Sequence, residues 1–185
     1  MGLAHDAAAA VGSALNSVRA GEDKLASSKL QVSGASMLSV TSPDFEPGEP
    51  LPIWATADGD GHAPRLMWSG VPAGAGSIVV MCEDPDAPFP QPYLHHLLYA
   101  IPPTVNAIDG SARKFGREGK NSKLATGFTP ASPPPGHGLH HYHFEVFALD
   151  RPLALEPGAG REAVIEAMSG HVMAFGETVG VYERK

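Results

Sequence analysis

Two short segments hold most of the side chains that could do chemistry in this chain. The first is Asp-Pro-Asp-Ala-Pro at residues 84–88, followed by His95 and His96. The second is Pro-Pro-Pro-Gly-His-Gly-Leu-His-His-Tyr at residues 133–142. Prolines and other turn residues restrict the backbone in both segments, so nearby carboxylates and imidazoles project in defined directions. This combination predicts the rim of a pocket that holds a small anion.

Asp84 and Asp86 flank a proline at the end of an apolar run. The two carboxylates could stabilise nearby protonated histidines, because an opposite charge within a few ångströms favours the imidazolium form. Alternatively, they could form an Asx-turn that satisfies the amides of the loop. The two interpretations are compatible, and the sequence leaves both open.

His95 and His96 stand at the entrance to a strand predicted at residues 97–101. Neighbouring residues of a strand point to opposite faces, so only one of these histidines can enter a given pocket. A lone histidine beside an apolar strand is more often packed or solvated than functional.

In the second segment, strand alternation places His140 and Tyr142 on one face. The other face carries His141, His143 and Glu145. Two imidazoles and a carboxylate could bind a transition metal. A sheet face in contact with water gives the same pattern more often, so we predict a solvated face and no metal site.

Apolar periodicity predicts mainly short strands, which must position these side chains. Continuous apolar runs predict buried strands at residues 77–82, 97–101 and 142–149. Shorter strands are predicted at residues 30–32, 37–40, 53–56 and 178–182. Helical spacing predicts a helix at residues 6–19 and a late helix with an apolar face of Ile165, Met168, Val172 and Phe175. The stretch 109–135 lacks periodicity, and we predict a long loop there.

The composition favours one β-rich domain. The chain has 185 residues, of which 43% are apolar, and this length suits one sizeable core. The 18 prolines and 21 glycines, beside only 18% charged residues, favour turns and short strands over long helices. We therefore expect one domain, and no linker divides the region after residue 36.

Charge and cysteine content limit the partners and the location. The net charge of −7 argues against nucleic acid, because binding to its phosphates needs a basic surface. A single cysteine, Cys82, excludes an internal disulfide and suits a reducing compartment, so we expect the cytoplasm. The apolar run at residues 7–11 is too short to span a bilayer, so we expect neither a signal peptide nor stable membrane insertion.

Signatures of common enzyme classes are missing from the sequence. It contains no Gly-x-Ser-x-Gly motif, and Cys82 lies in a predicted apolar strand, where a thiol is normally inert. The Gly-Ala-Gly string at residues 74–76 lacks the spacing of a dinucleotide fingerprint, and no phosphate-loop motif is present. We therefore predict a protein that is not an enzyme and needs no cofactor.

The two segments, in this order, resemble the phosphatidylethanolamine-binding protein family, also called the Raf kinase inhibitor protein family, and especially its bacterial branch. The resemblance extends over residues 38–184 and includes Ser-Pro-Asp-Phe at 42–45, Ala-Pro-Arg-Leu-Met-Trp at 63–68 and Gly-His-Val at 170–172. Relatives often carry a glycine and a cysteine just before the triple proline, where this chain has Pro-Ala-Ser at residues 130–132. The resemblance therefore does not define the pocket shape at that point.

The resemblance places a single domain of this family at residues 37–185 and leaves residues 1–36 as an N-terminal extension with the amphipathic helix. It implies a mainly β fold, a large Greek-key sandwich of antiparallel strands with a few peripheral helices. It also implies an anion pocket on the rim, in which His95 is the pocket histidine and His96 the fallback. The residues implied to form this pocket are Asp84, Asp86, Pro88, Tyr93, His95, Pro133, Pro134, Gly136, Gly138, His140 and Tyr142.

The function expected from this pocket is non-catalytic recognition of a phosphoryl or carboxylate head group. His95 and Tyr142 would donate hydrogen bonds, and binding would tighten as the pH falls towards six, because a protonated imidazole attracts the anion. An alternative is a module that regulates a kinase or protease by binding a phosphoprotein or the protease itself. A metal-dependent hydrolase is less favoured. The bacterial branch implies a homodimer.

Overall fold

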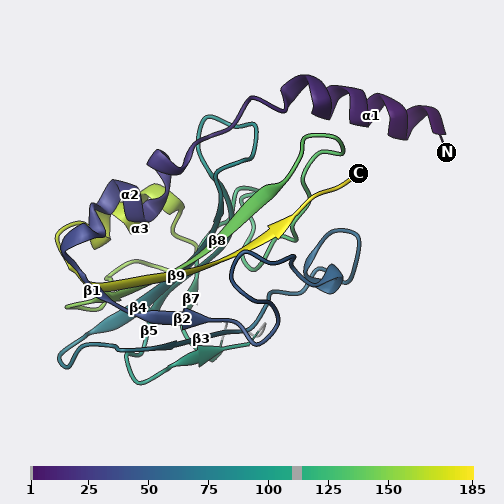
Figure 1. Ribbon diagram of the computed structural model, residues 1–185. Helices are drawn as coiled ribbons and strands as arrows, with labels where there is room; N and C mark the ends of the chain where they lie inside the picture. The colour runs from purple at the N-terminus through teal and green to yellow at the C-terminus, as the bar shows by residue number, and fades with distance from the viewer. Residues whose placement is uncertain (1, 110–113) are drawn as a thin grey trace.

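The computed structural model describes residues 2–109 and 114–185, and within them the strands form two sheets (Figure 1). The larger sheet has the order β1 (Ser36–Met37), β9 (Val172–Tyr182), β8 (His140–Leu149), β4 (Ser77–Asp84), β5 (Tyr93–Ile101) and β7 (Arg117–Glu118). The smaller sheet has the order β2 (Ser39–Thr41), β3 (Leu66–Ser69) and β6 (Ala107–Ile108). Neighbouring strands are antiparallel except β1 and β9. The mainly β fold is confirmed.

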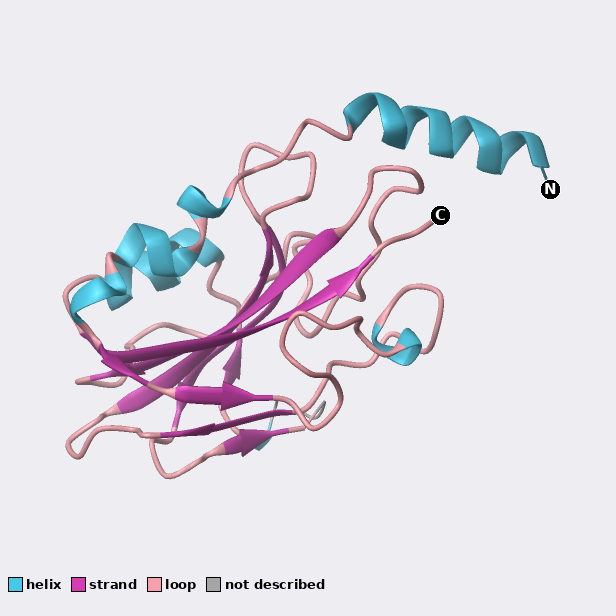
Figure 2. Cartoon of the chain, viewed as in Figure 1, coloured by secondary structure: helices cyan, strands magenta, loops and turns pink. Residues whose placement is uncertain are grey.

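The helical elements are peripheral to these sheets (Figure 2). The α-helices are α1 (Gly2–Leu15), α2 (Ala26–Leu30) and α3 (Arg161–Met168). The 3₁₀ turns are η1 (Glu22–Lys24), η2 (Val32–Gly34) and η3 (Ile53–Ala55). Figure 1 shows α2 and α3 beside each other on one side of the larger sheet, with β2 and β3 on the opposite side.

The central strand β4 is buried along its whole length because both faces of the larger sheet are covered. Ile78 and Val80 belong to the core that includes Trp68 of the smaller sheet. Val79 and Met81 belong to a second core, which the apolar residues of α2 and α3 complete. A strand covered on both sides needs apolar side chains at every position, which explains the continuous run in its sequence.

The N-terminal helix α1 extends beyond the end of the sheets, as Figure 1 shows. It ends at Leu15, four residues before the predicted end at residue 19. Val11, Leu15 and Val18, which form its expected apolar face, are 59%, 36% and 45% exposed. This face therefore does not pack on the body of the protein.

Three local predictions were wrong. Residues 30–32 and 53–56 form no strand: Leu30 ends α2, Val32 begins η2, and Ile53 begins η3. The late helix ends at Met168, so Val172 and Phe175 lie in β9 instead. Gly170 adopts a φ of 77°, a left-handed conformation that ends the helix and lets the chain turn into the strand.

The prediction of a solvated face at His141, His143 and Glu145 was wrong for His143 and Glu145, which are buried, whereas the side chain of His141 is 43% exposed. Glu145 is fully buried, and its Oε1 accepts a hydrogen bond from the backbone N–H of Ser27 at 3.1 Å. Glu83 is equally buried and accepts from the N–H of Ala26 at 2.8 Å. Burial, the largest effect, raises the pKa of Glu145 well above its usual value, and the nearby Glu83 raises it further.

One buried ion pair joins α3 to the sheet below it. The guanidinium of Arg161 contacts both carboxylate oxygens of Glu83 and also donates to the carbonyl of Lys24 at 2.7 Å. Only 8% of the Arg161 side chain and none of the Glu83 side chain is exposed. The pair thus holds α3 and the segment before α2 on the same face.

We predict that Arg161→Met lowers the free energy of unfolding by about 3 to 5 kcal/mol, because it leaves a buried carboxylate without its cation. Urea denaturation measures the effect. Arg151→Met is the matched control, since Arg151 pairs with Asp150 in an exposed position and its loss should change stability little. Equal effects of the two substitutions would show that the buried pair contributes no more than a surface pair.

Candidate functional site

The carboxylate of Asp84 joins the two segments singled out in the sequence. Its Oδ1 accepts hydrogen bonds from the N–H groups of Asp86 and Ala87 at 2.9 and 3.2 Å. Its Oδ2 accepts from Nδ1 of His140 at 2.8 Å. Asp84 is 3% exposed and His140 1%. The Asx-turn and the orientation of a histidine therefore occur together at one buried carboxylate.

Asp86 forms a second link between the same segments. Its Oδ2 accepts from both the backbone N–H and Nδ1 of His141 at 2.7 Å, and its Oδ1 pairs with Arg19 at 2.5 Å. Burial alone would raise the pKa of Asp86, but the hydrogen bonds from His141 and Arg19 outweigh it, so the pKa is lowered. Asp86 therefore stays ionised and holds the loop in place.

These links frame a cavity of about 270 Å³. Its lining includes seven of the eleven pocket residues that the sequence suggested, namely Asp84, Pro88, Tyr93, His95, Pro133, Pro134 and His140. Asp86, Gly136, Gly138 and Tyr142 do not line it. A cavity of this size suits a head group smaller than a typical drug-sized ligand.

His95, rather than His96, faces this cavity. Its Nδ1 donates to the carbonyl oxygen of Thr129 at 2.7 Å, so the neutral ring presents Nε2 as an acceptor. Burial lowers the pKa of His95, although the charge of Asp84 partly opposes this. His96 is buried on the other face, and burial lowers its pKa to about 4.

Tyr142 lies beneath the cavity. Its ring meets that of His95 edge-on with centroids 5.1 Å apart, and its buried hydroxyl has no hydrogen-bond partner among the described residues. Burial raises the pKa of this phenol well above its usual value, and Asp84 raises it further. The geometry gives Tyr142 a packing role under His95.

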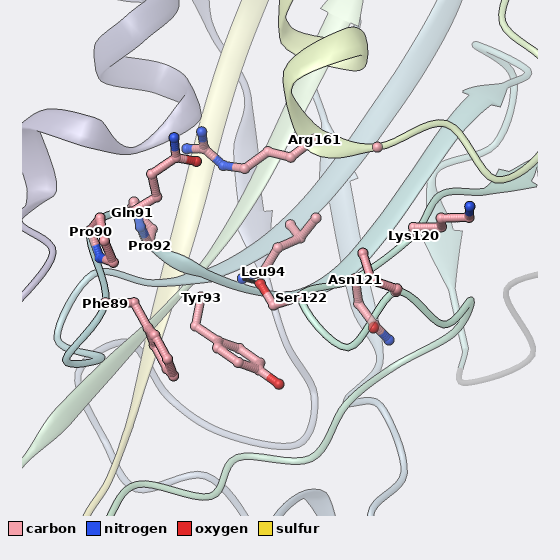
Figure 3. Close-up of a pocket in the computed structure, with 12 residues that line it drawn as sticks. Phe89, Pro90, Gln91, Pro92, Tyr93, Leu94, Lys120, Asn121, Ser122 and Arg161 are labelled. Carbon is pink, nitrogen blue, oxygen red and sulfur yellow. Dashed lines mark hydrogen bonds between the residues drawn. The ribbon is translucent and has the colours of Figure 1, made fainter.

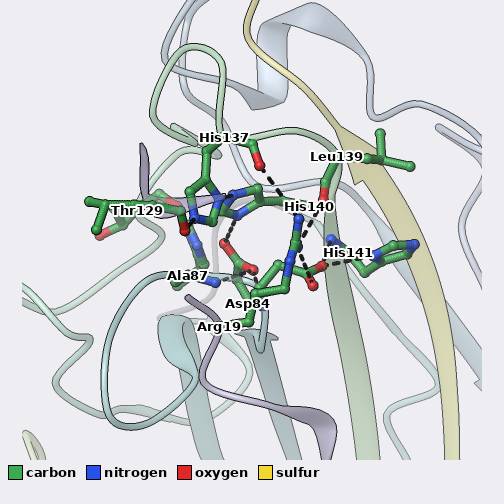
Figure 4. Close-up of polar contacts among 11 residues, drawn as sticks. Arg19, Asp84, Ala87, Thr129, His137, Leu139, His140 and His141 are labelled. Atoms are coloured by element: carbon green, nitrogen blue, oxygen red, sulfur yellow. Dashed lines mark hydrogen bonds and ion pairs between the residues drawn. The ribbon is translucent and has the colours of Figure 1, made fainter. Parts of the chain in front are cut away.

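His140 has both ring nitrogens occupied. Nδ1 contacts Asp84, and Nε2 lies 2.7 Å from Nδ1 of His137, a fully buried residue of the glycine-rich turn (Figure 4). In this arrangement His140 contributes its electrostatic field to the cavity rather than a free hydrogen bond. Gly136 and Gly138 shape the turn that carries His137, with φ values of 74° and 95°.

Several lining residues were missed in the sequence. Lys123 and Thr129 come from the loop predicted at residues 109–135, and Phe89 follows Pro88. Lys123 brings a cation to the cavity and forms no ion pair within the described part of the chain. The only signal for Lys123 was its place in a long basic loop, which does not show where the loop folds back.

A groove adjoins the cavity and shares Phe89 and Tyr93 with it (Figure 3). Its volume is about 600 Å³. Figure 3 shows the rings of Phe89 and Tyr93 side by side, with centroids 5.7 Å apart, and Lys120 on another part of the wall. Leu124, which also lines the groove, is 79% exposed. The cavity therefore continues into a wider and more apolar surface.

The structure offers no metal-ligand cluster within residues 2–109 and 114–185. The set His141, His143 and Glu145 is divided among separate partners, since His141 contacts Asp86 and His143 contacts Glu177. In the same residues, no helix has the length and apolar character needed to cross a membrane.

Comparison with known proteins places this geometry in a family. The family model described as phosphatidylethanolamine-binding protein matches residues 41–183. A UPF0098 protein of Pyrococcus abyssi is 39% identical over 159 residues, which is 82% of this chain and 88% of that protein.

Two solved structures share the fold and more than a quarter of the sequence. A phosphatidylethanolamine-binding protein homologue of Chlamydia trachomatis, CT736, superimposes with a TM-score of 0.76 at 34% identity, covering 82% of this chain and all of its own. E. coli YbcL, described as a new member of the mammalian PEBP family, superimposes with a TM-score of 0.75 at 30% identity, covering 81% of this chain and all of its own. These matches confirm the resemblance, and the chain belongs to the phosphatidylethanolamine-binding protein family.

Proposed function

We propose that this protein binds a small anionic head group, phosphoryl or carboxylate, in the cavity beside His95 and Lys123. The observation that carries the proposal is Lys123, which forms no ion pair with the described residues and lines a partly enclosed cavity whose carboxylate already accepts three hydrogen bonds. Because Asp84 accepts three hydrogen bonds, its charge is largely balanced, and an anion entering the cavity meets Lys123.

The lining supplies hydrogen-bond donors suited to oxyanions. Lys123 offers an ammonium group, and Tyr93 and Ser132 offer hydroxyls. The neutral His95 ring offers an acceptor at Nε2, which can take the hydroxyl of a protonated phosphoryl or carboxyl group. Alternatively, His95 gains a proton when the anion binds and becomes a donor.

We infer a non-catalytic role. Cys82, the only cysteine, is fully enclosed in β4, where burial raises its pKa well above the usual value, so it is not a thiolate nucleophile. The cavity lining includes a hydroxyl at Ser132, but among the described residues no hydrogen bond joins this hydroxyl to a histidine that could act as its base. We also propose a homodimer in the cytoplasm, as the sequence led us to expect.

A second candidate role is docking of an acidic or phosphorylated protein segment. The groove beside the cavity supports it, because Phe89 and Leu124 are 52% and 79% exposed and lie near Lys120 and Lys123. Aromatic side chains such as Phe89 are enriched at protein interfaces. In this role the cavity would hold the anionic group and the groove an adjoining apolar side chain.

We predict that Lys123→Ala weakens the binding of inorganic phosphate roughly ten- to a hundredfold, because a hydrogen bond to a charged group contributes about 1.5 to 3 kcal/mol. Isothermal titration calorimetry measures the affinity. Lys120→Ala, three residues away and outside the cavity, is the control and should bind almost as the unaltered protein does. An unchanged affinity in Lys123→Ala would remove this cation from the site.

We also predict that sulfate binds more tightly as the pH falls from 8 to 5. Burial lowers the pKa of His95 and so favours the neutral ring in the free protein, whereas a bound anion favours the imidazolium form. Binding therefore takes up a proton, so affinity rises with acidity by up to about tenfold per pH unit, the limit for one proton.

Sulfate is the suitable probe because it keeps its own charge across this range, so the pH dependence reports on the protein. His95→Gln should lose the part of the dependence that comes from proton uptake by His95. His96→Gln should keep it, since His96 lies outside the cavity. If the unaltered protein and His95→Gln gave parallel pH profiles, proton uptake by His95 would be disproved.

A further inference from the structure

Residues 12–21, here called the strap, lie across both loops that frame the cavity. The N–H groups of Ala20 and Gly21 donate to the carbonyls of Ala87 and Pro85 at 3.1 and 2.9 Å. Arg19 pairs with Asp86 and donates to the carbonyl of Leu139 at 3.1 Å. The strap lies outside the residues that the family model matches, which begin at residue 41.

The first part of the strap packs against the glycine-rich turn. A Cβ added at Gly12 would overlap the carbonyl oxygen of Pro135, so the helix approaches the turn closely only because this residue is glycine. Ser13 Oγ lies 3.4 Å from the carbonyl oxygen of Gly136. The carbonyl oxygen of Leu15 lies 2.8 Å from Nε2 of His137.

A continuous hydrogen-bond chain therefore runs from the strap to the cavity. It passes from the Leu15 carbonyl to His137, from His137 to His140, and from His140 to Asp84, with distances of 2.8, 2.7 and 2.8 Å. Figure 4 shows the part between His137 and Asp84. The cavity is lined by the last two residues of this chain but not by His137.

The net charge of this hydrogen-bond chain depends on the number of protons that its side chains share. A carbonyl oxygen at one end and a carboxylate at the other can only accept, so three hydrogen bonds need three protons. Two neutral imidazoles supply only two of these three protons. With three protons the side chains of Asp84, His140 and His137 are together neutral, whichever of them holds the third. With two protons they carry a charge of −1, and one of the three bonds is lost.

The state with three protons favours an anion in the cavity, because the state with two protons repels it. The charged and titratable groups that face the two histidines from the described elements are Asp84, Asp86, Arg19, His95 and Lys123. Burial, the largest effect, lowers the pKa of His95; Asp84 and the hydrogen bond to Thr129 raise it, and the nearby His140 lowers it further.

We propose that docking of the strap and anion binding in the cavity reinforce each other through the hydrogen-bond chain from Leu15 to Asp84. This inference rests on the proposed function. An anion stabilises the complete chain and thereby the bond to the Leu15 carbonyl, and a docked strap holds the chain in the state that accepts the anion. Such coupling is reciprocal by thermodynamic necessity. The N-terminal extension is thus a regulatory element of the site.

Cleavage by trypsin after Arg19 measures how often the strap is undocked. Trypsin can bind the Arg19 side chain only after its ion pair with Asp86 has opened. We expect saturating phosphate to slow this cleavage in the full chain about fivefold or more, the lower range of typical coupling. Mass spectrometry identifies the fragment that begins at Ala20. A control peptide substrate shows whether phosphate affects trypsin itself.

Gly12→Ala should displace the strap while leaving every cavity residue in place. We expect faster cleavage after Arg19 and phosphate affinity about fivefold weaker or more, the same factor in both directions of the coupling. Gly34→Ala is the matched control, since a Cβ there meets nothing within 4 Å, and it should match the unaltered protein. His137→Phe interrupts the hydrogen-bond chain but fills the space of the imidazole. In this variant we expect phosphate to give no protection against cleavage after Arg19.

The outcomes separate this inference from the proposed function. Phosphate that binds the unaltered protein, gives no protection after Arg19 and binds Gly12→Ala equally well would overturn the coupling and leave the anion site standing. No phosphate binding to the unaltered protein would overturn both. Protection that persists in a folded His137→Phe variant, checked by its unfolding temperature, would show that the coupling does not pass through the histidines and so would reject the proposed chain.

Discussion

The buried carboxylate of Asp84 is the interaction on which the cavity depends. A charge in a nearly inaccessible position is tolerated only when its hydrogen bonds are satisfied, and Asp84 finds its three donors in the loop that follows it and in His140. These donors come from the ends of β4 and β8, adjacent strands of the larger sheet. One carboxylate therefore sets the position of both proline-rich turns and so the shape of the cavity.

The end of β4 carries a second buried acid that points the other way. Glu83 and Asp84 are neighbours, so strand alternation directs them to opposite faces of the sheet. Glu83 accepts from the N–H of Ala26 and pairs with Arg161 under the helices, while Asp84 organises the cavity. Two adjacent acids thus join the covering helices and the functional site to the same strand, and both require strand β4 to keep its register.

The electrostatics of the site are local. The chain carries a net charge of −7, which disfavours anions at long range, and the acids near the cavity are neutralised by hydrogen bonds and by Arg19. Lys123 then supplies the attraction at short range. Because the cavity is small and most of its donors are neutral, binding of a simple anion would be modest and dependent on salt. Neighbouring apolar surface at Phe89 provides room for the remainder of a larger ligand.

Much of this protein could be predicted from the sequence alone, because the relevant signals are local. The apolar run of β4, the turn at residues 84–88 and the family motifs predicted a mainly β fold and seven residues that line the cavity. Alternation and apolar spacing failed where the tertiary structure decides burial: His143 and Glu145 looked solvated, yet both are buried, and Ser27 of α2 donates a hydrogen bond to Glu145. Val172 and Phe175 fit a helical face, yet pairing with β8 places them in a strand.

Some contacts between segments far apart in the chain could not be predicted from the sequence. Lys123 reaches the cavity because the long loop folds back beside β5, as the hydrogen bond from the Ser122 N–H to the Leu94 carbonyl shows. The strap reaches His137 because Gly12 lets a helix approach the turn at Pro135. The sequence by itself determined which residues could form turns, strands and charged groups, since these depend on local sterics and polarity. Only the tertiary structure decided which charges are buried, which are paired and which remain free for a ligand, because those depend on neighbours far away in the chain.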